Sequence, residues 1–172
     1  MAIPRVFTVA EVDALIPRLA ELVAEQLHRQ SVVEEGLAEL ARVAGGLPPT
    51  IEPTDDDSAE IQRLKLELAR RIKDYDDGWR EVQALGAVVK DPQIGLLDFY
   101  GNVDGRLVWL CWRYGEESLR YWHDLRSGYS DRQPLRIEAR QRLWNGAMDR
   151  AAAERAIADF LRALGRDPSQ DP

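Results

Sequence analysis

Apolar residues recur every three or four positions from Val12 until Gly45-Gly46 stops the pattern. This spacing places them on one face of a helix. Thr8-Val9-Ala10-Glu11 has the pattern of a capping box, in which the threonine hydroxyl accepts a backbone hydrogen bond and the glutamate reaches back. We therefore predict a long helix over residues 8–44. Pro17 lies inside this pattern and should kink the helix or move its start about one turn later.

The same periodicity returns after the segment LPPTIEPTDDD, whose prolines and lack of a repeat are typical of a loop. Asp57-Ser58-Ala59-Glu60 repeats the capping-box pattern, and an apolar stripe follows until Gly86. The sequence thus predicts a second helix over residues 57–85. Two amphipathic helices joined by a loop bury their stripes against each other, so we expect an antiparallel hairpin with coiled-coil-like packing.

After Gly86 the pattern changes to short apolar runs bounded by turn residues, which is typical of strands. We predict a β-ribbon over residues 88–113 from Val88-Val89, Leu96-Leu97 and the run 107–112. Asp104-Gly105 tolerates positive φ and indicates a hairpin between the last two strands, without fixing their register. Because the last strand is apolar on both faces, both need cover. We expect the helical hairpin on one face and SLRYWHDL or a partner subunit on the other.

The rest of the chain is predicted to be helical. Ser118 to Leu125 is expected to form a short helix, and residues 136–172 a helical tail that Asn145-Gly146 interrupts. The predicted fold class is mainly α (α+β), with a long antiparallel helical hairpin packed on a small antiparallel β-ribbon and a C-terminal helical tail. We expect a single α+β domain over residues 1–135, followed by the tail.

Composition narrows the classes of function. At 172 residues the chain has the length of one domain. Its formal net charge of −7 has the wrong sign for neutralising phosphates, so no nucleic-acid partner is expected. We expect no membrane association and a cytoplasmic location, because there is no leader-like segment and no apolar run of spanning length. The single cysteine fits a reducing compartment and excludes a multi-cysteine metal site.

Polar residues among the aromatic ones of the region 98–132 are the candidates for ligand binding: Asp98, Arg113, Glu116, His123 and Arg132. One interpretation of His123 is a metal site shared with carboxylates among Asp98, Glu116, Glu117 and Asp124. The other is a structural hydrogen bond to a carboxylate. We favour the second, because no second histidine stands at ligand spacing, and we expect neither a metal ion nor a cofactor.

Eight of the thirteen aromatic residues lie between Phe99 and Tyr129. Trp109, Trp112, Tyr121 and Trp122 either line an apolar pocket, with Arg113, Arg120 and Arg132 binding an anion, or form a core or an interface. We favour core or interface. Cys111 lies in an apolar run and is expected to be buried and protonated rather than nucleophilic.

The predicted second helix carries five basic residues interspersed with acidic ones, which indicates a solvated face with local ion pairs rather than a polyanion site. These basic residues are Arg63, Lys65, Arg70, Arg71 and Lys73. The acidic run Asp55 to Asp57 lacks the other ligands of a calcium-binding loop and is interpreted as helix capping.

The segment VVKDPQIGLLDFYGNVDGRLVWLCWRYGEESLRYWHDLRSGYSDRQPL resembles the bacterial family called domain of unknown function 2203, and FTVAEVDALIPRL resembles its N-terminal helix. The family pattern pairs VKD…GLxDF with DGR…V…LCW…GE…WHE and a GFxGR loop. The chain matches most of it from Val88 to Leu135 and departs at Asp124, Tyr129 and Ser130-Asp131. The resemblance implies no established reaction and no catalytic residues.

A second resemblance begins at Met148, where MDRAAAERAIADFLRALGRDPSQDP is similar to the N-terminal helix of GTP cyclohydrolase I, which commonly ends in LGxDP. It implies a link to pterin or folate biosynthesis. The zinc ligands and catalytic core of that enzyme are absent from this chain, so its activity is not implied. A fusion and a chance likeness between Ala-rich helices are the alternatives.

We predict a non-enzymatic interaction or assembly module that forms a homodimer and has room for a protein partner. Two long apolar stripes and a two-faced ribbon present more apolar surface than one copy covers. The alternative is a small-molecule-binding or metal-assisted enzyme that uses the candidate residues of the region 98–132.

Overall fold

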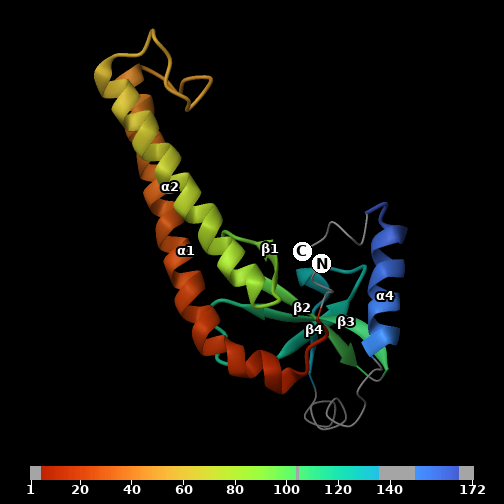
Figure 1. Ribbon diagram of the computed structural model, residues 1–172. Coiled ribbons are helices and arrows are strands. Elements are labelled where there is room, and N and C mark those ends of the chain that lie inside the picture. The colour runs from red at the N-terminus through yellow and green to blue at the C-terminus, as the bar shows by residue number, and fades with distance from the viewer. Residues whose placement is uncertain (1–4, 104, 136–149, 167–172) are drawn as a thin grey trace. The chain divides into compact units, whose positions relative to one another are not determined.

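The computed structural model describes residues 5–103, 105–135 and 150–166. The elements in chain order are α1 (Val9–Ala44), α2 (Ala59–Ala84), β1 (Val88–Asp91), β2 (Leu96–Val103), β3 (Arg106–Arg113), β4 (Tyr121–Asp124), the 3-10 turn η1 (Tyr129–Asp131), β5 (Gln133–Pro134) and α4 (Arg150–Ala163) (Figure 1). Long helices beside an antiparallel sheet confirm the predicted α+β class. None of the described helices is both long and apolar enough to cross a membrane.

The chain divides into two compact units. The hairpin unit comprises Glu21–Val82, and the sheet unit comprises Met1–Ala20 together with Gln83–Pro172. α4, the described part of the predicted tail, belongs to the sheet unit. A domain boundary after residue 135 stays a prediction, and the break expected at Asn145-Gly146 lies outside the described residues.

α1 begins where the capping box places it. Oγ1 of Thr8 accepts from the backbone nitrogen of Glu11 at 3.2 Å, and Oε2 of Glu11 accepts from the backbone nitrogen of Thr8 at 2.8 Å. These two bonds satisfy amides that have no partner within the helix. Pro17 lies inside α1 and does not move its start, so the expected later start was wrong.

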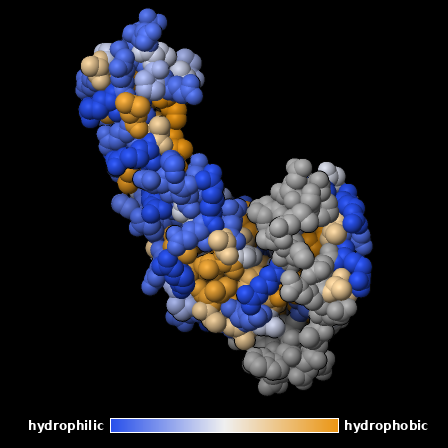
Figure 2. Space-filling view, viewed as in Figure 1, coloured by the Kyte–Doolittle hydropathy of each residue, from blue (hydrophilic) through white to orange (hydrophobic). Residues whose placement is uncertain are grey.

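In the hairpin unit, α1 and α2 are antiparallel and are joined by side chains that reach the backbone of the other helix. Nε2 of Gln26 donates to the carbonyl of Tyr75 at 2.6 Å, and Arg71 donates to the carbonyl of Val32 at 3.3 Å. The predicted hairpin is confirmed, whereas coiled-coil packing stays a prediction. Figure 2 shows its visible surface as mostly hydrophilic, with apolar patches between the polar side chains.

Lys65 is the exception among the basic residues of α2. Its side chain is 2% exposed, and its ammonium lies 2.8 Å from Oδ2 of Asp57 and 3.2 Å from the carbonyl oxygen of Glu52. Asp57 therefore holds the interhelical loop to α2, while Ser58 caps the helix by accepting from the backbone nitrogen of Ile61. The expectation of a solvated Lys65 and of Asp57 as the cap was wrong.

The other described ion pairs on α2 follow the prediction. Arg63 and Arg71 both pair with Glu67, and Lys73 pairs with Asp77 four residues later. Such local pairs neutralise the basic side chains within the helix itself.

The loop contact predicts an acid-dependent loss of stability. The hydrogen bond from Lys65, together with the one from the Thr54 backbone, holds the pKa of Asp57 below its ordinary value. A carboxylate with a lowered folded-state pKa stabilises the fold above its unfolded value of about 3.9, and this contribution is lost as pH falls through the folded pKa. We expect Asp57→Asn to lower the free energy of unfolding at pH 7 and to flatten its decline below about pH 4.

Urea denaturation at a series of pH values measures both effects. Asp55→Asn, an exposed carboxylate in the same loop, is the matched control. Equal stability and equal pH dependence of the two variants would contradict the contact between Lys65 and Asp57.

The sheet unit is built on a five-stranded antiparallel meander in the order β1-β2-β3-β4-β5. β2 and β3 pair from Leu96↔Arg113 to Val103↔Arg106, so the turn between them has two residues, and Gly105 has a φ of +80°. The predicted hairpin is confirmed. Tyr121–Asp124 pairs with β3 as β4, so the expected helix over Ser118 to Leu125 was wrong. Pairing with the exposed edge of β3 overrides the local pattern.

Both faces of β3 are covered within the sheet unit. On one face, Phe7 packs edge-on against Phe99 with ring centroids 5.3 Å apart, and Asp13 on α1 accepts from the backbone nitrogen of Leu119. On the other face, Tyr100 and Trp109 pack against α4, whose core residues here are Ile157 and Leu161 (Figure 1). The cover on this face is α4, and the expectation of SLRYWHDL or a partner subunit there was wrong.

Candidate functional site

Three buried polar side chains lie together on the sheet face that α4 covers. Asp98 on β2 pairs with Cys111 on β3, and His123 on β4 pairs with Trp109 on β3. Because side chains alternate along a strand, this register turns all three to the same face. One ligand atom from each lies within 4.8 Å of the other two, and no side chain is more than 3% exposed. We call these residues the Asp–Cys–His cluster.

His123 is held at both ring nitrogens. Nδ1 lies 3.0 Å from the backbone oxygen of Asp124, and Nε2 lies 3.0 Å from Oδ2 of Asp98. Burial alone lowers the pKa of His123, but the hydrogen bond to Asp98 and its negative charge outweigh burial, so the pKa lies above its ordinary value. The hydrogen bond predicted between His123 and a carboxylate is present.

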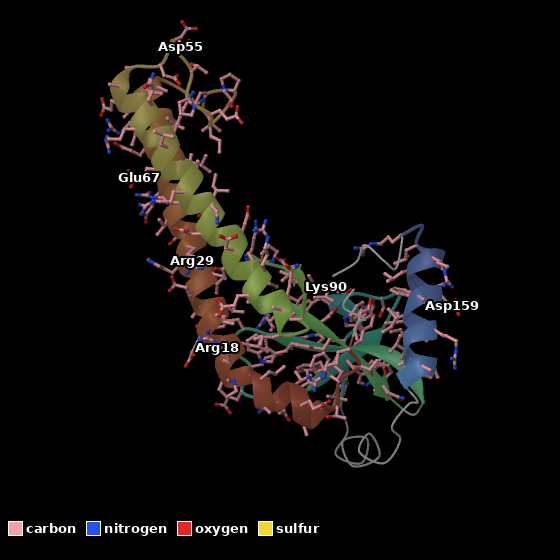
Figure 3. The ribbon with its side chains drawn as sticks, viewed as in Figure 1. Arg18, Arg29, Asp55, Glu67, Lys90 and Asp159 are labelled. Atoms are coloured by element: carbon pink, nitrogen blue, oxygen red, sulfur yellow. The ribbon has the colours of Figure 1, made fainter. Side chains whose placement is uncertain are left out.

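Cys111 and Lys90 complete the surroundings of Asp98. Burial, and then the charge of Asp98, raise the pKa of the Cys111 thiol well above its ordinary value, as expected for a protonated cysteine. Nζ of Lys90, labelled in Figure 3, lies 3.8 Å from Oδ2 of Asp98 and 4.0 Å from the ring centroid of Trp109. Burial lowers the pKa of Lys90, and Asp98 opposes this shift only in part.

Arg132, Glu116 and Arg113 form a second contact group on the other side of Cys111. Nη1 of Arg132 lies 3.0 Å from Oε1 of Glu116 and 4.0 Å from Sγ of Cys111. Burial lowers the pKa of Arg132, but Glu116 outweighs burial and raises it. Oε2 of Glu116 accepts from the backbone nitrogen of Arg113, whose guanidinium donates to the hydroxyl of Tyr129.

The structure thus arranges the five candidate residues as two groups, Asp98 with His123 and Arg113 with Glu116 and Arg132. Cys111 lies between the groups. Of the other proposed metal ligands, Glu117 and Asp124 are exposed, and neither belongs to the Asp–Cys–His cluster. A ligand-binding role for the five residues stays a prediction.

The four aromatic residues proposed to line a pocket lie on two different faces. Trp109 and Tyr121 point to the face that α4 covers, and Trp112 and Trp122 point to the opposite face. They therefore do not line one pocket together. Trp112 is fully buried, and its Nε1 donates to the carbonyl of Glu116 at 2.9 Å, which fits the core interpretation.

The sequence interpretation did not include Lys90 and Cys111 in the site. The missing step was the register of the hairpin. A two-residue turn at Asp104-Gly105 sets Val103 opposite Arg106, and counting back from this pair sets Asp98 opposite Cys111. The sequence signal for the pair was therefore the length of the turn.

A family model of uncharacterized conserved proteins, DUF2203, matches residues 5–135. The chain belongs to this family. The match confirms the resemblance drawn from the sequence, and the matched residues include the whole Asp–Cys–His cluster. Neither a curated protein nor a solved structure matches the chain. The likeness of residues 148–172 to GTP cyclohydrolase I lies outside the DUF2203 match and stays a prediction.

Proposed function

We propose that this DUF2203 protein is a non-enzymatic assembly module that forms a homodimer through its hairpin unit. The supporting observation is the apolar surface that remains on the two helices. Leu66 is 62% exposed, and further apolar positions on both helices are only half-buried. These positions are Val33, Leu37, Ile61, Leu64 and Ile72.

A second copy of the same hairpin fits this surface by its chemistry. Two helices do not cover an apolar stripe from all sides, whereas four helices from two hairpins do. A two-fold axis would bring the same stripe from each copy together. The basic residues Arg63, Arg71 and Lys73 already pair with acidic residues of their own helix, which favours an apolar partner over a polyanion.

The sheet unit gives no comparable reason for a partner, because its central strand is covered on both faces by its own chain. The predicted role of a twin in sheltering the ribbon is therefore transferred to the hairpin. Cytoplasmic location is part of the same proposal.

Sedimentation equilibrium tests the proposal. We expect the wild-type protein at micromolar concentration to have twice the chain mass of 19.5 kDa. Leu66→Glu should have the mass of a single chain, because a charge on this exposed position costs little in the monomer and is desolvated in the dimer. Ile94→Glu, at a 41% exposed position of the sheet unit, is the control and should remain dimeric.

A wild-type protein of 19.5 kDa under these conditions would contradict the dimer. A dimer that survives Leu66→Glu and dissociates with Ile94→Glu would contradict the role of the hairpin.

A further inference from the structure

The contact between His123 and Asp98 requires a positive charge between them. The backbone oxygen of Asp124 only accepts hydrogen bonds, so Nδ1 of His123 must carry a proton. Nε2 of a neutral ring then presents a lone pair, 3.0 Å from an oxygen of a carboxylate that also only accepts. Two lone pairs at this distance repel each other unless a proton or a metal ion lies between them.

The site offers more donor atoms than one shared proton uses. Oδ1 of Asp98 is buried and has no hydrogen-bond partner among the described residues. A buried carboxylate oxygen without a partner costs free energy. Sγ of Cys111 is a third donor within 4.8 Å of the ligand atoms of Asp98 and His123. A shared proton leaves Oδ1 and Sγ unused, whereas a metal ion takes ligands from all three residues.

We propose that Asp98, Cys111 and His123 bind one divalent transition-metal ion, with zinc as the best-fitting member of the class. This site goes beyond the assembly function and does not depend on it. Imidazole nitrogen, thiolate sulfur and carboxylate oxygen are the three donor types that zinc takes in proteins. Magnesium and calcium prefer oxygen ligands throughout, so a donor set with nitrogen and sulfur selects against them.

The contacts around the three residues are those of a prepared site. A metal-binding histidine commonly donates its second ring N–H to a backbone carbonyl, which fixes the tautomer and the ring orientation. Nδ1 of His123 does this with the carbonyl of Asp124. The three residues come from β2, β3 and β4, which are neighbours in one sheet, so the backbone holds them in register.

The exchange of protons for metal balances in charge. Without metal, the site contains the proton between His123 and Asp98 and the thiol proton of Cys111. Binding of a dication by neutral imidazole, carboxylate and thiolate releases both protons, so two positive charges leave and two enter. The net charge of the buried site stays the same, which avoids the large cost of burying an uncompensated charge.

Two cations adjoin the site and shape the test. Arg132 is neutralised by Glu116 at 3.0 Å. Lys90 lies 3.8 Å from Asp98, and its charge opposes that of a bound metal ion. Lys90→Gln leaves all three ligands in place, so this variant should bind metal at least as tightly as the wild type.

Cobalt titration of the metal-free, full-length protein tests the proposal. The chain contains one cysteine, so a thiolate-to-cobalt charge-transfer band can arise only from Cys111. We expect this band to saturate at one Co²⁺ per chain and to disappear when Zn²⁺ is added. A protein that gives no charge-transfer band, or only the weak spectrum of cobalt bound by oxygen, would overturn the proposal.

Two substitutions separate this site from binding at the surface. Cys111→Ala should abolish the charge-transfer band and weaken Zn²⁺ binding by about tenfold or more. His28→Gln, which removes the other, exposed histidine on α1, should bind as the wild type does. Equal Zn²⁺ affinities of the two variants in a competition with a chromophoric chelator would contradict the site.

The thermal midpoint keeps the test decisive if a variant folds poorly. A metal ion that binds only the folded state stabilises it. Zn²⁺ should therefore raise the unfolding midpoint of the wild-type protein and of His28→Gln, monitored by circular dichroism. An unchanged wild-type midpoint at saturating Zn²⁺ would count against the proposal irrespective of any variant.

Discussion

Trp112→Ala is expected to lower the free energy of unfolding by about 3–5 kcal/mol. The side chain is fully buried in β3, and its Nε1 donates to the carbonyl of Glu116 at 2.9 Å. Truncation leaves a cavity on the face toward the N-terminal segment and removes the donor to that carbonyl. Since a domain is stable by only about 5–15 kcal/mol, the variant should be close to unfolding at room temperature. Urea denaturation at 25 °C measures the loss.

Two further substitutions separate the ring of Trp112 from its N–H group. Trp112→Phe retains most of the ring and loses the donor, so a smaller cost of about 1–3 kcal/mol is expected. Tyr114→Ala changes a nearby aromatic residue that is 37% exposed, and its effect should stay within about 0.5 kcal/mol. If Trp112→Ala and Tyr114→Ala had equal effects, Trp112 would not be part of the core.

Gly86→Ala is expected to destabilise the protein by about 2–5 kcal/mol, because two separate costs add. Gly86 has a φ of +94°, which costs an L-residue about 1–2 kcal/mol. The new Cβ would lie 2.4 Å from Cζ of Phe7, and overpacking of this kind costs about 1–3 kcal/mol. Phe7 does not move away easily, because it is 2% exposed and packs against Phe99.

Three other glycines of the sheet unit separate these two costs. Gly105→Ala introduces positive-φ strain alone, since no atom lies within 4 Å of the new Cβ. Gly101→Ala introduces overpacking alone, with Cγ of the buried Leu110 at 2.3 Å. Gly128→Ala introduces neither and should be nearly neutral. Thermal denaturation ranks the four variants, and a Gly86→Ala variant as stable as Gly128→Ala would contradict the packing of Phe7.

Features that local sequence determines were predicted well. The capping box at Thr8 and the apolar stripes defined both long helices, because caps and periodicity act within a few residues. The turn at Asp104-Gly105 defined the hairpin of β2 and β3 for the same reason. The Asp98, Cys111 and His123 arrangement depended in addition on register, which the two-residue turn encodes.

Features that depend on distant contacts were not predicted. Tyr121–Asp124 is too short for its pattern to distinguish a strand from a helical turn, and pairing with β3 decides it. Lys65 was expected in solvent because lysine is rarely fully buried without a partner. Its partner, Asp57, lies in the preceding loop, and only the fold of that loop brings the two together. The packing of α4 against Tyr100 and Trp109 is likewise a tertiary contact.

The reactivity of Cys111 toward a thiol reagent tests most directly whether the sheet is covered on both faces and encloses the Asp–Cys–His cluster. The single cysteine is fully buried on the face that α4 covers, so every labelled molecule reports on that face. In native buffer at neutral pH we expect labelling no faster than the opening of the sheet unit, and complete labelling in denaturant. Stoichiometric labelling within the mixing time in native buffer would contradict the covered sheet.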